Sequence, residues 1–352
     1  MHLYPAHEAP ADETQRETLG ASASAAPVGT GRASGKVILL GEHAVVYGVP
    51  ALAIGIDRGA RATAFEGGSP TSVLEVPAWD VRVAEGDAST DLGRAFTALV
   101  AAAREHGACA SLARSGSVTV SAYSELPPGG GLGCSAALGV AIARALVPAL
   151  AATEVADLAM AWERVFHGNP SGIDAAVAAH GGSILFERGN PMQPVPLKGT
   201  LTVCLGSTGV PSSTKTMVDG VARLRERKPE LVEKSFAGIT SLVRNARLAL
   251  EADDTVGLGK LMDLNQMILS GLFVSTEEIE RLCGLAREAG ALGAKLTGAG
   301  GGGCVVALAA DGVSADRIVA AWEAAGFSGF SSTVQATIAA ANAAPPAAEA
   351  SA

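Results

Sequence analysis

The chain has 352 residues, a formal net charge of −9 and 48% hydrophobic residues, which is enough for a globular protein with two domains. Its basic residues are dispersed and form no stripe interleaved with aromatic residues, so nucleic acid is not expected as a partner. The five cysteines lack the two-residue spacing of zinc sites and redox pairs, and their odd number favours a reducing, cytoplasmic location. The most apolar stretch, residues 136–152, contains Arg144 and Pro148 and predicts a buried helix, not a membrane span.

The first part of the chain is predicted to be a flexible extension over residues 1–30, followed by alternating strands and helices. Strands are expected at 36–40, 51–56, 117–122 and 183–187, with a strand-like alternation at 63–83. Besides the buried helix, helices are expected at 91–106, 154–166 and 171–180. Gly168 is expected to end the helix before it, and Ser171 to cap the last one.

The proline-rich segment 191–199 is interpreted as the crossing into a second unit. We therefore expect an N-terminal domain over 31–195, a C-terminal domain over 196–340 and a flexible tail over 341–352. In the second unit, strands are predicted at 201–206, 304–309 and 331–339, helices at 213–227, 231–252, 256–269, 276–289 and 315–325, and a loop at 290–303. This order of strands and helices predicts an α+β sandwich.

The segment ELPPGGGLGCSAA, residues 125–137, places several glycines directly before a predicted helix. Glycine N–H groups can approach an anion closely, and a helix N-terminus adds unpaired N–H groups, so the segment favours phosphate binding. It is not a Walker A loop, because no Gly-Lys pair precedes Ser135. Three interpretations remain at this point: a nucleotide triphosphate loop, a tight structural turn, and a dinucleotide site using Gly131, Gly133, Ala136 and Glu154.

A second glycine-rich segment, KLTGAGGGG at residues 295–303, also contains a dinucleotide-like spacing. It leads into a predicted strand, whereas the dinucleotide fingerprint lies between a strand and the helix that follows it. Two glycine loops from opposite halves of the chain are more consistent with closing on one ligand from two sides. The alternative is two independent turns, which four consecutive glycines make entropically costly.

Phosphoryl transfer needs a divalent cation, a carboxylate to hold the cation and a group that orients the acceptor hydroxyl. Ser135 at the helix start is a candidate cation ligand, and Glu163 and Asp174 flank one turn, so both can point into one cleft. Each acid could also be an ordinary exposed helix carboxylate. Glu42 and His43, which follow the first strand, could equally be solvated loop residues.

Four segments together resemble the mevalonate kinase branch of the GHMP kinases, a superfamily that includes galactokinase, homoserine kinase and phosphomevalonate kinase. They are GKVILLGEHAVVYG, PPGGGLGCSAA, HGNPSGID and KLTGAGGGGC, and they span Gly35 to Cys304. The resemblance implies the two-domain GHMP kinase fold, with a ribosomal protein S5 domain 2-like N-terminal domain and a ferredoxin-like α/β C-terminal domain. It also implies ATP-dependent, Mg²⁺-requiring phosphorylation of the primary hydroxyl of mevalonate, with a homodimer as a candidate assembly.

Site residues follow from the resemblance by position. Asp174 would face the substrate hydroxyl as base or orienter, and Lys36 would pair with it and stabilise charge on the acceptor oxygen. Ser135 and Glu163 would bind Mg²⁺. The remaining predicted contacts are Glu42, His43 and Thr214 for mevalonate, and Pro127, Pro128, Gly129, Gly130, Gly131, Leu132, Gly133, Cys134 and Ser135 for the nucleotide.

The sequence departs from the family pattern at two positions. Cys134 replaces the first serine of the usual GLGSSA, which is expected to remove a hydroxyl from the phosphate site, and Ser34 replaces the proline of APGK. Two rival functions are weighed against a mevalonate kinase. One is a kinase of the same fold acting on phosphomevalonate or another small alcohol, and the other is a nucleotide-binding or metabolite-binding regulator without catalysis.

Overall fold

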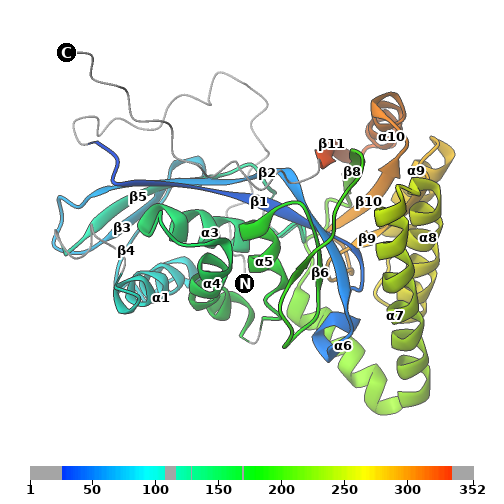
Figure 1. Cartoon of the computed structure of the whole chain (residues 1–352), viewed down its shortest axis with the longest axis horizontal. Coiled ribbons are helices and arrows are strands. Elements are labelled where there is room, and N and C mark those ends of the chain that lie inside the picture. Colours follow the sequence, from blue (N-terminus) through cyan, green and yellow to red (C-terminus); the bar gives the residue numbers. More distant parts are fainter. Residues whose placement is uncertain (1–25, 108–115, 128, 169, 335–352) are drawn as a thin grey trace.

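The computed structural model describes residues 26–107, 116–127, 129–168 and 170–334, which form two sheets, each with its own helices. In Figure 1 the first half of the chain lies on the left, in blue to green, and most of the second half lies on the right. The expected α+β composition is confirmed. Within the described ranges, none of the helices has the length and apolar character needed to cross a lipid bilayer.

A seven-stranded sheet forms the first half, with the strand order β4-β3-β5-β2-β6-β7 and with β1 paired to β2. The helices of this half lie together on one face of the sheet (Figure 1). The strands are β1 (Gly29–Leu40), β2 (Ala51–Glu66), β3 (Val73–Val76), β4 (Val81–Ala84), β5 (Val118–Ser124), β6 (Ser183–Phe186) and β7 (Gln193–Pro194). The helices are α1 (Asp91–Glu105), α3 (Cys134–Leu146), α4 (Ala152–His167) and α5 (Ile173–His180), with single 3-10 turns η2 (Ala44–Tyr47) and η3 (Pro77–Trp79).

Helix α3 lies unusually close to β1 because the strand presents glycines to it. A Cβ atom built on Gly29 would lie 2.1 Å from the carbonyl oxygen of Ala145, and one built on Gly31 would lie 2.0 Å from that of Ala141. Both distances are far shorter than any contact between real atoms, so only glycine fits. This contact fixes the axis of α3, and with it the position of the helix N-terminus, relative to β1.

A four-stranded antiparallel sheet in the order β11-β8-β10-β9 forms the second half. Its strands are β8 (Leu201–Ser207), β9 (Gly293–Thr297), β10 (Cys304–Ala309) and β11 (Ser328–Val334). Its helices are α6 (Thr214–Arg227), α7 (Pro229–Ala252), α8 (Thr255–Gly271), α9 (Glu277–Glu288) and α10 (Gly312–Ala324).

Specific contacts join the two halves. The Ser332 hydroxyl donates to Asp57 Oδ1 at 2.6 Å, and the Arg58 guanidinium lies 3.9 Å from the centre of the Phe330 ring. The Ile38 N–H donates to Thr297 Oγ1 at 3.0 Å. The halves therefore meet along β2 and β11 and, separately, where β1 meets β9.

Three predictions of secondary structure are wrong. Residues 290–303 are not all loop, because 293–297 form β9 and pair with β10. Ser171 is not the N-cap of α5, because Gly172, with φ of 92°, occupies that position, although the Ser171 hydroxyl accepts from the Ile173 N–H at 3.4 Å. Finally, β1 begins at Gly29, so residues 29 and 30 are strand and not extension. Residues 1–25 of the expected extension and the whole expected tail lie outside the described ranges.

Two mid-helix glycines provide a matched test of this packing. A Cβ on Gly139 of α3 would lie 2.7 Å from Cδ1 of the buried Trp162, whereas one on Gly284 of α9 would meet nothing within 4 Å. We expect Gly139→Ala to lower the free energy of unfolding by about 1–3 kcal/mol through overpacking. Gly284→Ala should raise it by about 0.5–1 kcal/mol through helix propensity. Urea denaturation measures both, and a stabilising Gly139→Ala would contradict the close packing of α3 on α4.

Candidate active site

The first glycine loop leads into the N-terminus of α3. Gly129, Gly131 and Gly133 have φ values of 74°, 75° and 75°, a left-handed conformation that residues with a Cβ disfavour. Gly133 is the N-cap of α3, and it provides no side chain to cap the first turn. The N–H groups at the start of α3, together with the helix dipole, therefore favour an anion at this point.

Lys36 of β1 connects this loop to α5. Its backbone N–H donates to the carbonyl oxygen of Leu132 at 2.8 Å, and its Nζ lies 2.9 Å from Oδ1 of Asp174. A Cβ on Gly133 would lie 3.2 Å from Cβ of Lys36, so a glycine there permits the close approach. Lys36 is 4% exposed and Asp174 is 31% exposed, which leaves the carboxylate accessible to a ligand.

Glu163 of α4 faces the start of α3. The Ser135 hydroxyl donates to Glu163 Oε1 at 2.7 Å, and it accepts from the indole N–H of Trp162 at 3.2 Å. Burial raises the pKa of Glu163 to about 7, and the charge of Asp174 adds to the rise, while Ser135 and Lys36 act against it. The two acids therefore lie close enough to interact, and Asp174 is the more exposed of the pair.

The oxygen atoms of Ser135 and Glu163 suit a hard cation. The described part of the chain contains no cluster of three or more His, Cys, Asp or Glu side chains that could hold a metal without further ligands. Mg²⁺ is usually bound by one or two carboxylates together with substrate phosphates and water, so this small donor set is of the expected kind.

The second glycine loop packs against the first. A Cβ on Gly298 would lie 3.3 Å from the carbonyl oxygen of Gly131, and one on Gly303 would lie 3.4 Å from that of Gly130. Thr208, which follows β8, donates from its hydroxyl to the Gly303 carbonyl at 2.9 Å. Segments that are far apart in the sequence thus form one glycine-lined region between the two halves.

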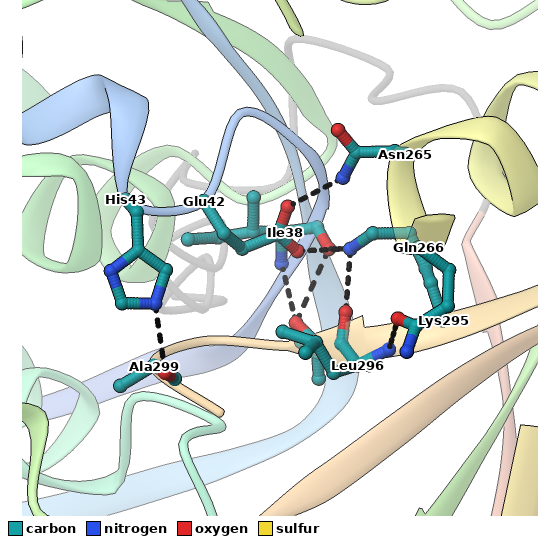
Figure 2. A network of polar contacts seen from close by, with 9 residues as sticks. Ile38, Glu42, His43, Asn265, Gln266, Lys295, Leu296 and Ala299 are labelled. Atoms are coloured by element: carbon teal, nitrogen blue, oxygen red, sulfur yellow. Dashed lines mark hydrogen bonds and ion pairs between the residues drawn. The ribbon is translucent and has the colours of Figure 1, made fainter. Parts of the chain in front are cut away.

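Glu42 and His43 are both buried where β1 meets the second half (Figure 2). The carboxylate of Glu42 forms an ion pair with Lys295 and accepts from Asn265 Nδ2 at 3.1 Å. Burial raises the pKa of Glu42 and lowers that of Lys295, and their mutual attraction opposes both shifts. His43 Nε2 donates to the Ala299 carbonyl at 2.8 Å, and burial lowers its pKa, so its neutral ring presents Nδ1 as an acceptor.

The chain is similar to known proteins of one family over most of its length. The N-terminal domain model of the GHMP kinases matches residues 94–182, and the C-terminal model of the same kinases matches residues 246–328. The mevalonate kinase of Thermococcus gammatolerans is 38% identical over 297 residues, covering 79% of this chain and 88% of that protein. The chain belongs to the mevalonate kinase family of GHMP kinases.

More distant members agree. Human mevalonate kinase is 30% identical over 364 residues, covering 85% of this chain and 90% of that protein. A crystal structure of L. major mevalonate kinase in complex with R-mevalonate superposes with a TM-score of 0.75 and 31% identity, covering 89% of this chain and 99% of that one. The two-domain GHMP kinase fold expected from the sequence motifs is therefore confirmed.

The structure brings most of the family-derived site residues together. Ser135 lies in the first turn of α3 and is bonded to Glu163, and the Lys36–Asp174 pair lies beside the same helix start. Thr214 is an exposed residue in the first turn of α6, and its mevalonate contact remains a prediction. Of the remaining loop residues, Pro127 is exposed, Leu132 is buried and Pro128 lies outside the described residues.

The sequence did not predict three residues that bind predicted site residues and hold them in place. Trp162 binds the Ser135 hydroxyl, while Asn265 and Lys295 bind Glu42. Lys295 gave one detectable signal, because it is the only charged residue in the otherwise small or apolar run GAKLT. Asn265 and Trp162 lie within amphipathic helices and gave none.

The Cys134 side chain was expected at the phosphate site, but its thiol contacts residues beneath the loop. Its Sγ lies 3.3 Å from Ser124 Oγ and 3.7 Å from the Leu126 carbonyl, and the side chain is buried. Burial raises the pKa of the thiol to about 11, which keeps it protonated. The thiol therefore packs beneath the loop toward β5, so the substitution changes the support of the loop more directly than its phosphate-facing surface.

We expect Cys134→Ser to fold and to remain active. A serine hydroxyl can bond to the same two oxygens, so the free energy of unfolding should change by about 1 kcal/mol or less. The KM for ATP should change by less than about fivefold, which corresponds to the same energy. Steady-state kinetics and urea denaturation provide the measurements. A folded but inactive serine variant would show that the thiol has a function beyond packing.

Proposed function

We propose that this chain transfers the γ-phosphoryl group of ATP to the primary hydroxyl of mevalonate, giving 5-phosphomevalonate in isoprenoid precursor synthesis. The observation that carries the proposal is the Lys36–Asp174 ion pair beside the uncapped N-terminus of α3. It unites a phosphate-binding element with a carboxylate that can bind an alcohol, which is the combination that phosphoryl transfer to a hydroxyl requires. Membership in the mevalonate kinase family selects the alcohol.

Each side chain has a distinct proposed role. The glycine loop and the first turn of α3 bind the phosphates through backbone N–H groups. The exposed Asp174 carboxylate orients or deprotonates the acceptor hydroxyl, and Lys36 holds that carboxylate and stabilises charge on the acceptor oxygen. Ser135 and Glu163 hold Mg²⁺, which when bound neutralises phosphate charge. His43 contributes a neutral ring to the acceptor site, and Thr214, the first residue of α6, is proposed to contact mevalonate.

The two rival functions make different predictions about this site. A phosphorylated acceptor needs cationic groups that are free to bind its phosphate. Lys295 contacts the proposed acceptor segment, residues 38–43, but its charge is already neutralised by Glu42. A regulator without catalysis would not need the Lys36–Asp174 pair. The release of ADP only when an alcohol is added would separate a kinase from such a regulator.

Location and assembly complete the proposal. The described cysteines, Cys134, Cys204, Cys283 and Cys304, are all buried free thiols, which is consistent with a reducing cytoplasm. A homodimer remains a prediction that light scattering of the purified chain can test.

Substrate identity is tested first, by a coupled ADP-release assay with mevalonate, phosphomevalonate, homoserine and galactose. Mevalonate should give the highest kcat/KM. A preference of about tenfold or more for another alcohol, which corresponds to about 1.4 kcal/mol in transition-state binding, would overturn the proposed substrate.

The division of roles between the two acids is tested by paired variants. Glu163→Gln weakens a cation ligand, so its main effect should be a higher Mg²⁺ requirement that excess Mg²⁺ or Mn²⁺ partly restores. Asp174→Asn cannot accept a proton, so turnover should fall by roughly 10² or more while ATP binding changes little. Extra metal should not restore it.

An exposed acid on the same helix as Glu163 provides the control. Asp157→Asn should leave both turnover and the metal requirement at the parent values. Metal rescue of Asp174→Asn to the same extent as Glu163→Gln, or near-normal turnover without rescue, would disprove the proposed roles.

A further inference from the structure

A buried polar network joins the two halves beside the proposed acceptor segment (Figure 2). Lys295 of β9 is completely buried, and its ammonium group contacts the Glu42 carboxylate and the carbonyl oxygens of Ile38 and Leu296. Asn265 of α8 donates to the second oxygen of Glu42 at 3.1 Å. Glu42 thus receives one partner from β9 and another from α8, both in the second half of the chain.

This network stabilises the contact between the two halves poorly, because burying its charged groups costs free energy. Burying a lysine and a glutamate removes both charges from water, and apolar residues of the same size often stabilise such a place as well or better. In addition, Asn265 Oδ1 is buried with no hydrogen-bond partner among the described residues, since its amide must turn its donor toward Glu42. Stability alone therefore does not explain the network, whereas a requirement for one fixed geometry does.

The network fixes the position and the backbone conformation of His43. The segment 295–299 contacts the segment 38–43 at three points: Thr297 with Ile38, Lys295 with Glu42, and Ala299 with His43. His43 has a left-handed φ of 60°, which is unfavourable for a residue with a side chain and persists only where the surroundings impose it.

The same segment also packs against the first glycine loop. Gly298 lies between the residues that bind Ile38 and His43, and it packs against Gly131. The position of His43 and the position of the phosphate loop are therefore both set from residues 295–299. A shift of Lys295 relative to Glu42 would change the separation between acceptor and phosphate donor.

We infer that Lys295 is a positioning residue for the acceptor, which acts through Glu42 to hold His43 in the orientation that receives mevalonate. The inference rests on the proposed function for the identity of the acceptor. In this account the Glu42 carboxylate supports the acceptor site from behind, in place of the direct substrate contact expected from the family motif.

The central test replaces both charges with uncharged groups of similar size. Lys295→Met alone would leave Glu42 charged and unpaired in the interior, so it is combined with Glu42→Gln. The double variant should keep a melting temperature close to that of the parent, because no buried charge is left unpaired. Its KM for mevalonate should rise about tenfold or more, while kcat and the KM for ATP stay within about threefold. The reason is that a misplaced His43 weakens the binding of mevalonate equally in the ground state and in the transition state.

Two further variants make the test decisive. Lys260→Met removes an exposed lysine of α8 and should leave all three constants unchanged. Asn265→Leu removes only the neutral partner of Glu42, so it keeps the ion pair and should fold even if the double variant does not. It should raise the KM for mevalonate by about threefold with no change for ATP.

The outcomes separate the positioning role from the proposed function. The inference is overturned if a folded double variant has the same KM for mevalonate as the parent, because the network is then only a structural junction. If the double variant does not fold, the same criterion applies to Asn265→Leu. If the parent enzyme prefers another alcohol, the proposed function is wrong. The selective loss of acceptor binding, measured with that alcohol, would then still establish Lys295 as a positioning residue.

Discussion

The proposed chemistry depends on the position of Lys36. Its N–H binds the Leu132 carbonyl of the first glycine loop, and its ammonium group lies 2.9 Å from Asp174 at the start of α5. One residue of β1 therefore sets both the phosphate loop and the proposed acceptor carboxylate. The glycines of the same strand let α3 lie directly against it, which places the N-terminus of that helix beside Lys36. The path of a single strand thus brings together the proposed phosphate-binding helix end and the proposed alcohol-binding carboxylate.

The second half of the chain completes the site from the opposite side. Its glycine loop packs on the first loop at Gly131, and the residues before that loop hold Glu42 and His43. Buried polar contacts cross this junction, next to an apolar core cluster that contains residues of both halves. Because hydrogen bonds and ion pairs have narrow geometric requirements, such a junction fixes distances more strictly than apolar packing does.

Local features of the fold could be predicted from the sequence, and long-range contacts could not. Periodicity located α1 within one residue, and the glycine loops marked the region where the halves meet. β9 was missed because Lys295 and Thr297 look like loop residues until β1 supplies their partners. The Glu42–Lys295 pair joins residues that are 253 positions apart, and no local pattern indicates such a pairing. Family motifs supplied the proposed roles of Asp174 and Glu163, whereas the burial and the hydrogen-bond partners of these residues required the structure.

Single-turnover phosphoryl transfer by Lys36→Met tests the central claim most directly. The variant removes the ammonium group and keeps most of the buried aliphatic stem, so thermal unfolding should show an intact fold. The account predicts that the rate of transfer from bound ATP to mevalonate falls by about 10² or more, while ATP affinity changes little, because the lost group stabilises charge on the acceptor oxygen. A folded Lys36→Met enzyme that transfers phosphate at the parent rate would contradict it.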